Sequence, residues 1–305
     1  MEKIYKRLRR IFFFVNIGYL YLIIPDMKEE ADESLRRMRG EVGERLRQRN
    51  SKYSLWLNTL RVSGYLLKDL DKGKMFEADY LWLRQIDDIA DGDLAVPQGY
   101  TSPADYVTQK LDFLLQPNKP KDDVEQLMLL CGRLSQKTGL ELSQARRDIV
   151  ESMLFDAQRL GTGTVFPEAV LQEYFYKCDI AGTIKGTLPL FGDHSENWPY
   201  LYDIGCAVRI YYNLRDFSHD VRVGFVNISQ EDMERFRITT ADLLDTNNLA
   251  LQAWFREQAQ RGLSLLETGG RTMRGAGFGR LGQQFVHLYH ERPARKFLQS
   301  VLVSN

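Results

Sequence analysis

The sequence has no surplus of either charge, because 41 lysines and arginines balance 41 aspartates and glutamates. Proteins that bind nucleic acid in general carry a basic surplus, so that class is disfavoured. Cysteine is also scarce, with Cys131, Cys178 and Cys206 far apart in the chain. Three scattered cysteines fit neither a disulfide framework nor a zinc cluster. We therefore expect reduced core cysteines and a cytoplasmic protein.

Signals for β-structure are scarce as well. Alternating strand patterns and Asn-Gly hairpin turns are few, and no Gly/Ser-rich linker or repeat of fixed period divides the chain. Apolar residues instead recur at spacings of three and four in residues 103–116, 122–139 and 143–161. We predict one all-α domain over residues 46–305, preceded by a basic and apolar extension over residues 1–45.

One further helix is expected to open at Pro167, where Glu168 follows in the first turn. Its interior glycines, Gly182 and Gly186, and then Pro189 predict a bend or a close approach by another group.

The N-terminal apolar run is too short to cross a bilayer comfortably. In residues 1–25 the basic EKIYKRLRR leads into IFFFVNIGYLYLII, whereas a spanning helix needs about 20 apolar residues. No small-residue cleavage site follows, which disfavours a signal peptide. A helix packed on the body of the protein is the first interpretation. Peripheral attachment to a membrane surface is the second, and cleaved export is the third.

Two acidic turns carry the strongest chemical signal. YLWLRQIDDIADGD places Asp87, Asp88 and Asp91 along one edge of an expected helix, and YYNLRDFSHDVRVG places Asp216 and Asp220 one turn apart. Like charges at this spacing repel on a bare helix. Apolar neighbours indicate that the first turn is largely buried, and buried carboxylates that stay charged need a cation. Carboxylate oxygens suit Mg²⁺.

Each acidic turn also carries an arginine. Arg84 lies three residues before Asp87, and Arg215 directly precedes Asp216. Alone, a D-x-x-x-D pattern nearly always marks a solvated helix face, and the arginine can be a plain ion-pair partner. Beside a metal ion, however, a guanidinium also holds the phosphate oxygens that the metal does not reach. Two such turns in one chain predict a diphosphate site.

In this order and spacing, the two motifs resemble those of the squalene/phytoene synthase family, the head-to-head prenyl diphosphate synthases. The segments YFYKCDIAGTIKG and VRVGFVNISQEDMERFRIT also resemble that family, and the resemblance covers about residues 50–240. It implies a single-domain class I isoprenoid synthase fold, an all-α bundle around a central apolar cavity. The implied activity is a Mg²⁺-dependent prenyltransferase that condenses two farnesyl or geranylgeranyl diphosphates to a C30 or C40 product.

The resemblance also implies roles for individual residues. The implied metal ligands are Asp87, Asp88, Asp91, Asp216 and Asp220, which would hold two or three Mg²⁺ ions. Diphosphate binding is implied for Arg84 and Arg215. Tyr80 and Tyr176 are placed near the reacting groups, with a plain core aromatic as the alternative for both.

The segment NSKYS resembles the family's His-Ser-Lys-Ser, which implies phosphate contacts from Ser51 and Lys52, although Asn50 replaces the histidine. The family's late tyrosine and arginine have a weak counterpart in Tyr289 with Arg292 or Arg295.

The sequence departs from the family just before the second acidic turn. Arg209 and Tyr212 stand where the family has glutamine and asparagine. Both share a helix face with the aspartates, so we expect both to line the site. Arg209 would bind diphosphate directly or weaken a metal position. Because tyrosine is a poor metal ligand, Asn213 is the candidate replacement. His219 within the motif is expected to be exposed or paired with a neighbour.

Two other functions stay open. The altered residues also suit a terpene cyclase or phosphohydrolase that acts on one prenyl diphosphate. Relatives of this family have become assembly factors, and the basic N-terminal extension suits that function, but retention of all five motif aspartates disfavours it. Use of NADPH stays open, since no Gly-rich dinucleotide fingerprint occurs and squalene-forming relatives need none.

Overall fold

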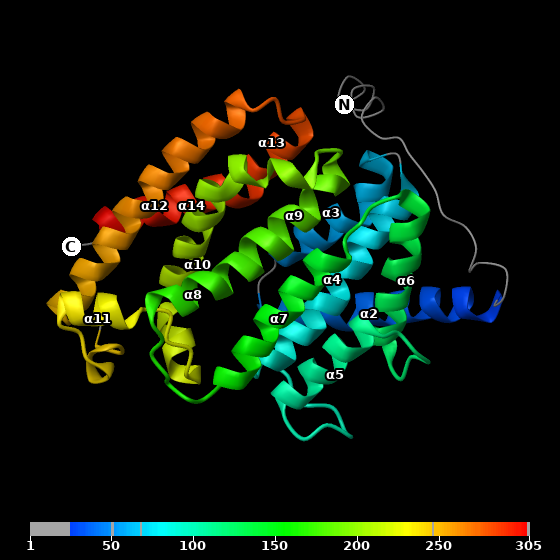
Figure 1. The fold of residues 1–305 in the computed structure, drawn as a ribbon, viewed down its shortest axis with the longest axis horizontal. Coiled ribbons are helices and arrows are strands. Elements are labelled where there is room, and N and C mark those ends of the chain that lie inside the picture. Colours follow the sequence, from blue (N-terminus) through cyan, green and yellow to red (C-terminus); the bar gives the residue numbers. More distant parts are fainter. Residues whose placement is uncertain (1–24, 50–51, 68, 246, 304–305) are drawn as a thin grey trace. The chain divides into compact units, whose positions relative to one another are not determined.

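The computed structural model describes residues 25–49, 52–67, 69–245 and 247–303 (Figure 1). These residues form helices and connecting segments without a strand, which confirms the expected all-α fold. They divide into two compact units, one running to Met153 with Leu190–Gly192 added, the other made of Leu154–Pro189 and the residues from Asp193 onward. Within the described ranges, none of the helices is both long and apolar enough to span a membrane.

The first unit is a bundle of packed helices. Its elements are α2 (Pro25–Arg49), α3 (Lys52–Leu66), α4 (Leu70–Ala90), α5 (Pro103–Leu115), α6 (Asp123–Thr138) and most of α7 (Ser143–Arg159). α4 contacts α2, α3, α5 and α6, so it is the central helix of the unit. The side chains of Met75, Leu81, Trp82 and Ile86 on α4 are fully buried. This burial fixes the helix that carries the first acidic turn.

Helix α2 is part of that packed core. Its apolar residues at spacings of three and four are buried: Ala31, Leu35, Met38, Val42 and Leu46. They lie on the side of α2 that contacts α3, α4 and α6. Each large apolar side chain buried in this way stabilises the fold by about 1.5–3 kcal/mol. Residues 25–45 therefore pack as a core helix, although they fall in the stretch named above as an extension.

The second unit is built around three helices that pack on one another. Its elements are the end of α7, α8 (Glu168–Phe175), η1 (Tyr176–Ile184), α9 (Lys185–Thr187), the first half of η2 (Leu188–Phe191), η3 (Ser195–Leu201), α10 (Tyr202–Val223), α11 (Gln230–Phe236), η4 (Thr240–Asp242), α12 (Leu249–Gly275), α13 (Arg280–Val286), η5 (His287–Glu291) and α14 (Arg292–Val303). Helices α10, α12 and α14 pack on one another, as Figure 1 shows for the yellow-green, orange and red helices. Their core includes Ala207, Leu214, Ala259, Leu266 and Leu298.

Local sequence signals set the helix ends. Asp69, Ser102, Asp122, Ser229 and Asn248 each accept a backbone N–H at the start of the following helix. α10, which carries the second acidic turn, ends at Val223 and is capped by Gly224 in the left-handed conformation, with φ of 91°.

The bend expected after Pro167 takes the form of a change in helix type. α8 opens behind Pro167 and continues as the π-helix η1, which returns to α-helix at Lys185. π-turns are rare and occur often at functional sites. Gly205 on α10 faces this segment, because a Cβ there would lie 2.6 Å from the Cδ1 of Ile180. A glycine at this position thus lets η1 lie against α10.

Helices α3 and α4 approach closely through a pair of glycines. A Cβ added to Gly73 would lie 2.2 Å from the Cα of Gly64, a backbone atom that cannot move aside. We expect Gly73→Ala to lower the free energy of unfolding by about 1–3 kcal/mol through overpacking. Denaturant unfolding followed by circular dichroism measures the change.

Gly132 on α6 provides the control, since a Cβ there would meet nothing within 4 Å. Gly132→Ala should be neutral or stabilise the protein by up to about 1 kcal/mol. Equal stability of Gly73→Ala and wild type would show that the two helices do not need this approach.

Candidate functional site

The first acidic turn lies at the C-terminal end of α4. The helix ends at Ala90, and Asp91 is its C-cap. The Asp88 side chain is only 1% exposed, whereas that of Asp87 is 30% exposed. Carboxylates at this end of a helix meet the negative end of its dipole, where cations are preferred. The charged carboxylates of this turn therefore need positive groups nearby.

Arg84 supplies part of that charge. Its Nη1 donates to Asp87 Oδ2 at 2.7 Å, and its Nη2 lies 2.5 Å from Asp88 Oδ1. Burial by itself would lower the pKa of the Arg84 guanidinium. The negative charges of Asp87 and Asp88 outweigh burial and hold the pKa above its ordinary value. Arg84 thus stays charged in a largely buried place.

Tyr80 lies on α4 two turns before Asp87, with its ring edge-on to Trp56 at 5.7 Å between centroids. The predicted phosphate contacts of Ser51 and Lys52 lie outside what the structure describes. Ser51 is not described, and neither is the side chain of Lys52, the first residue of α3. Both contacts stay predictions.

The second acidic turn lies near the C-terminal end of α10. Arg215 Nε donates to Asp216 Oδ1 at 2.8 Å, its Nη2 contacts Oδ2, and its Nη1 donates to the Tyr211 hydroxyl at 3.1 Å. Its guanidinium also lies over the Tyr212 ring, 4.8 Å from the centroid. Arg215 is partly exposed at 40%. His219 is exposed, as expected.

Asp220 is the carboxylate least compensated in this turn. Burial, and then the charge of Asp216, raise its pKa from 3.8 to about 6. Its Oδ2 accepts a hydrogen bond from Asn227 Nδ2 at 3.2 Å. A neighbouring carboxylate and the end of α10 both disfavour its charged form. A bound cation would favour it.

A polar network that the sequence analysis missed supports Asp220. Arg159 Nη1 donates to Asn227 Oδ1 at 2.9 Å, and Asn227 in turn contacts Asp220. Arg159 also donates to Asp156 at 2.7 Å, and the Tyr174 hydroxyl donates to the same carboxylate at 2.6 Å. Arg159 is 3% exposed and lies over aromatic rings. No signal in the sequence joined residues that lie 68 positions apart.

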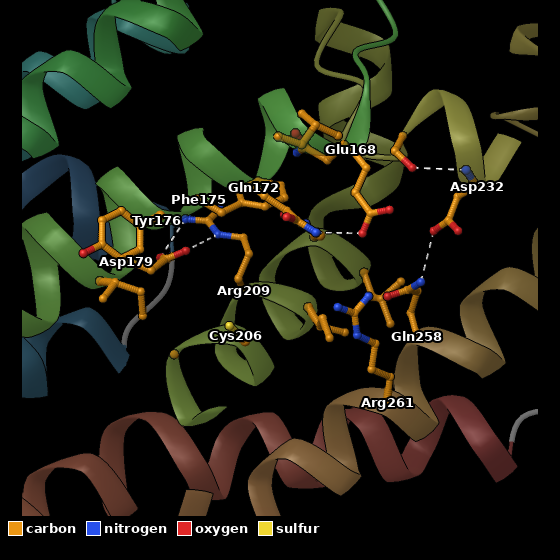
Figure 2. Close-up of a pocket in the computed structure, with 18 of the residues that line it drawn as sticks. Glu168, Gln172, Phe175, Tyr176, Asp179, Cys206, Arg209, Asp232, Gln258 and Arg261 are labelled. Atoms are coloured by element: carbon orange, nitrogen blue, oxygen red, sulfur yellow. Dashed lines mark hydrogen bonds and ion pairs between the residues drawn. The ribbon is translucent and has the colours of Figure 1, made fainter. Parts of the chain in front are cut away.

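A cavity of about 190 Å³ in the second unit lies beside η1 and α10 (Figure 2). Arg209 and Asn213, which were expected at the site, line it, and so does Tyr176. Tyr212, Asp216 and Asp220 are not among the lining residues. Tyr212 instead packs against Tyr211, with centroids 5.0 Å apart, and burial raises its pKa to about 12.

Arg209 is neutralised inside this cavity by Asp179, a residue that the sequence analysis did not single out. Arg209 Nε lies 2.6 Å from Asp179 Oδ2 and its Nη2 lies 2.8 Å from Oδ1, a bidentate pair visible in Figure 2. Its Nη2 also contacts Cys178 Sγ at 3.3 Å. Burial alone would lower the pKa of Arg209, but the charge of Asp179 raises it well above its ordinary value. The added positive charge is thus matched locally.

The remaining predicted residues are placed as follows. Tyr176 begins η1, and its hydroxyl accepts a hydrogen bond from Lys185 Nζ at 2.9 Å. Tyr289 lies in the π-helix η5, with its ring against Phe285. Arg292 begins α14, and Arg295 Nη2 donates to the carboxylate of Glu291 at 3.2 Å.

The carboxylate oxygens of the two acidic turns are the type of ligand that hard cations prefer. Each turn offers carboxylates one helical turn apart, the oxygen ligands that Mg²⁺ prefers, and the raised pKa of Asp220 marks a place short of positive charge. No group of three or more His, Cys, Asp or Glu side chains in the described part of the chain is arranged to hold a metal. Each turn alone would leave coordination positions for water and diphosphate oxygens.

A model of the squalene/phytoene synthase family matches residues 73–295. The chain belongs to that family. Among curated protein sequences none gives a significant match.

Two solved structures are similar to this squalene/phytoene synthase family member. The squalene synthase HpnC from Alicyclobacillus acidocaldarius matches with a TM-score of 0.65 at 16% identity, over 91% of this chain and 95% of that one. A dehydrosqualene synthase in complex with ligand matches with a TM-score of 0.57 at 19% identity, over 92% of this chain and 100% of that one. At this identity the likeness shows the fold.

Asp220 should lower the free energy of unfolding at pH values where its carboxylate is charged. Its folded pKa of about 6 exceeds the unfolded value of roughly 3.9, so its penalty is fully present above pH 6 and fades towards pH 4. We expect Asp220→Asn to raise the free energy of unfolding by about 1–3 kcal/mol at pH 7.5 without divalent cations. Denaturant unfolding at several pH values measures this.

Glu267→Gln is a matched surface control, because Glu267 is 69% exposed on α12. It should change the stability by less than about 0.5 kcal/mol at any pH. A loss of stability in Asp220→Asn at pH 7.5 would contradict the assignment of an uncompensated charge.

Arg209 and Asp179 should depend on each other for stability. Arg209→Gln restores the family's residue but leaves the Asp179 carboxylate without its bidentate partner. We expect the free energy of unfolding to fall by roughly 3 kcal/mol, and Arg209→Gln combined with Asp179→Asn to recover most of that loss. A double-mutant cycle measures the coupling, and simple additivity of the two changes would show that the pair contributes nothing.

Proposed function

We propose that this squalene/phytoene synthase family member is a Mg²⁺-dependent prenyltransferase. It condenses two allylic prenyl diphosphates, farnesyl or geranylgeranyl, head to head to a C30 or C40 product and releases pyrophosphate. The observation that carries the proposal is that both acidic turns lie towards the C-terminal end of a helix with an arginine beside their carboxylates, and that Asp220 is short of positive charge. The squalene and dehydrosqualene synthases with the same fold support it.

The metal would be held by Asp87 and Asp91 on α4 and by Asp216 and Asp220 on α10. Bound there, Mg²⁺ supplies Lewis-acid stabilisation of the charge on the departing diphosphate. Every one of these aspartates offers oxygen ligands, the type that hard cations prefer. Asn213 stays a candidate ligand, as it is buried on α10 one turn before Asp216.

The arginines have a separate role in the same reaction. Arg84 and Arg215 each carry guanidinium N–H groups next to the acidic turns, where they bind phosphate oxygens and orient the leaving group. Arg84 keeps its charge through Asp87 and Asp88. Arg209, by contrast, is taken up by Asp179, so it adds no net charge to its cavity.

The proposal is tested by analysing products. The purified protein is incubated with Mg²⁺ and farnesyl or geranylgeranyl diphosphate, with and without NADPH, while released pyrophosphate is followed and extracts are read by mass spectrometry. A C30 or C40 hydrocarbon, or its cyclopropyl diphosphate intermediate, is expected. Monomeric alcohols or cyclic products would assign a phosphohydrolase or terpene cyclase instead. An absence of turnover and of Mg²⁺-dependent binding would favour an assembly factor.

The motif aspartates should be needed for turnover and not for folding. Asp87→Asn and Asp216→Asn should each lower the rate of pyrophosphate release at least a hundredfold, because each removes a metal-binding charge. The circular dichroism spectrum should stay helical. Steady-state kinetics with the product assay measures the effect.

Two aspartates at the opposite ends of the same helices serve as controls, Asp71 on α4 and Asp203 on α10. Asp71→Asn and Asp203→Asn should keep turnover near that of wild type. Full activity in Asp87→Asn or Asp216→Asn would remove the basis of the metal assignment.

Attachment to a membrane surface through the N-terminal apolar run stays a prediction. Residues 1–24 lie outside the described residues.

A further inference from the structure

Two arginines of α2 meet the first acidic turn within the first unit. Arg45 and Arg49 lie one helical turn apart at the C-terminal end of α2. Arg45 Nη2 lies 3.2 Å from Asp88 Oδ2, and Arg49 Nη1 lies 3.3 Å from Asp88 Oδ1. Arg49 Nη2 also lies 2.6 Å from Asp93 Oδ2. Neither arginine belongs to a motif of the sequence.

With Arg84, three guanidiniums therefore converge on the single carboxylate of Asp88. That carboxylate is 1% exposed, and its Oδ1 pairs with Arg84 Nη2 at 2.5 Å in addition to Arg49. One carboxylate has two oxygens, so the three guanidiniums share Oδ1 and Oδ2 of Asp88. Asp87 and Asp93 supply further negative charge at the rim, where they are 30% and 28% exposed.

This cluster still has unused donor capacity. Arg84 Nε is buried and has no hydrogen-bond acceptor among the described residues. A buried donor without an acceptor is unfavourable, and an incoming acceptor would relieve it. Arg49 is 36% exposed and Arg45 23%, so both can be reached from solvent. The cluster is thus partly open, whereas Arg209 is closed off by Asp179.

The chemistry of the cluster selects a multiply charged oxyanion. Guanidiniums bind phosphate oxygens through pairs of parallel N–H groups. Three of them within reach of one carboxylate match the several oxygens of a diphosphate better than the few of a single phosphate.

We propose that Arg45 and Arg49 of α2 join Arg84 in a guanidinium cluster that binds a diphosphate group. This inference rests on the proposed function, because it makes the helix before α3 part of the substrate site at the first acidic turn. The diphosphate is that of the prenyl substrate or the pyrophosphate released from it, which share the same binding chemistry.

The competing explanation is that these arginines only fasten α2 to α4. Arg39 provides a matched control for it, since it joins the same two helices. Arg39 Nε lies 2.6 Å from Glu77 Oε1 and its Nη2 lies 2.7 Å from Oε2, with the arginine 31% exposed. Arg39 is away from the acidic turn. If these arginines only join α2 to α4, substitution of Arg39 and of Arg49 should have the same effect on pyrophosphate binding.

The experiment compares Arg49→Gln and Arg39→Gln in the full chain. Binding of inorganic pyrophosphate is measured by calorimetry with and without Mg²⁺, and the unfolding midpoint is measured in parallel. We expect Arg49→Gln to weaken pyrophosphate binding roughly tenfold or more, the loss of one charge-assisted hydrogen bond. Arg39→Gln should change it less than about twofold, although both variants lose an ion pair between the same helices. Arg49→Lys keeps the charge without the fork and should give an intermediate affinity.

Each contrary outcome overturns the cluster. If wild type and Arg49→Gln bind pyrophosphate with equal affinity, the cluster does not bind diphosphate. The same follows if wild type does not bind pyrophosphate at all. Equal affinity of wild type for inorganic phosphate and pyrophosphate would overturn the assignment to a diphosphate.

Kinetics with a prenyl diphosphate separates this inference from the proposed function and distinguishes the two sources of diphosphate. A raised KM with little change in kcat for Arg49→Gln assigns the cluster to the substrate, whereas a changed inhibition constant for pyrophosphate alone assigns it to the product. If wild type does not turn over prenyl diphosphates but Arg49→Gln still weakens pyrophosphate binding, the proposed function fails and the cluster stands. If wild type turns over prenyl diphosphates but Arg49→Gln changes neither KM nor the affinity for pyrophosphate, the proposed function stands and the cluster is overturned.

Discussion

A carboxylate at the C-terminal end of a helix meets the negative end of the helix dipole, and it stays charged only with positive charge nearby. Both acidic turns of this chain stand under that constraint, at the ends of α4 and α10. Arg84 and Arg215 provide part of the compensation, and Asp220, with its pKa raised to about 6, is left short of it. Carboxylates placed in this way lower the stability of the fold. A bound ligand that brings cations would compensate their charge.

The arginines near these turns differ in how much of their binding capacity is already used. Arg209 forms two short contacts with Asp179 and is 16% exposed, so its charge is balanced within the fold. Arg49 is 36% exposed, and its neighbour Arg84 retains a buried donor without an acceptor among the described residues. The departure from the family at Arg209 is therefore compatible with the proposed prenyl transfer. Helix α2 adds two arginines that the family motifs do not contain.

What the sequence could predict follows from how far apart the interacting residues are. Helix periodicity, and the pairs of Arg84 with Asp87 and of Arg215 with Asp216, depend on neighbours within one turn, so the pattern of residues was sufficient. The family motifs located both acidic turns. Arg45 reaches Asp88 across 43 positions and Arg209 reaches Asp179 across 30, and such contacts exist only once helices pack. For that reason Asp179 and α2 were missed.

The central claim is that both acidic turns bind Mg²⁺ and, with it, diphosphate. The most direct test is the Mg²⁺-dependent affinity for pyrophosphate of wild type, Asp87→Asn and Asp216→Asn. The account predicts that each change weakens binding strongly, because each removes a metal-binding charge. A variant of either turn that binds pyrophosphate as wild type does would contradict it.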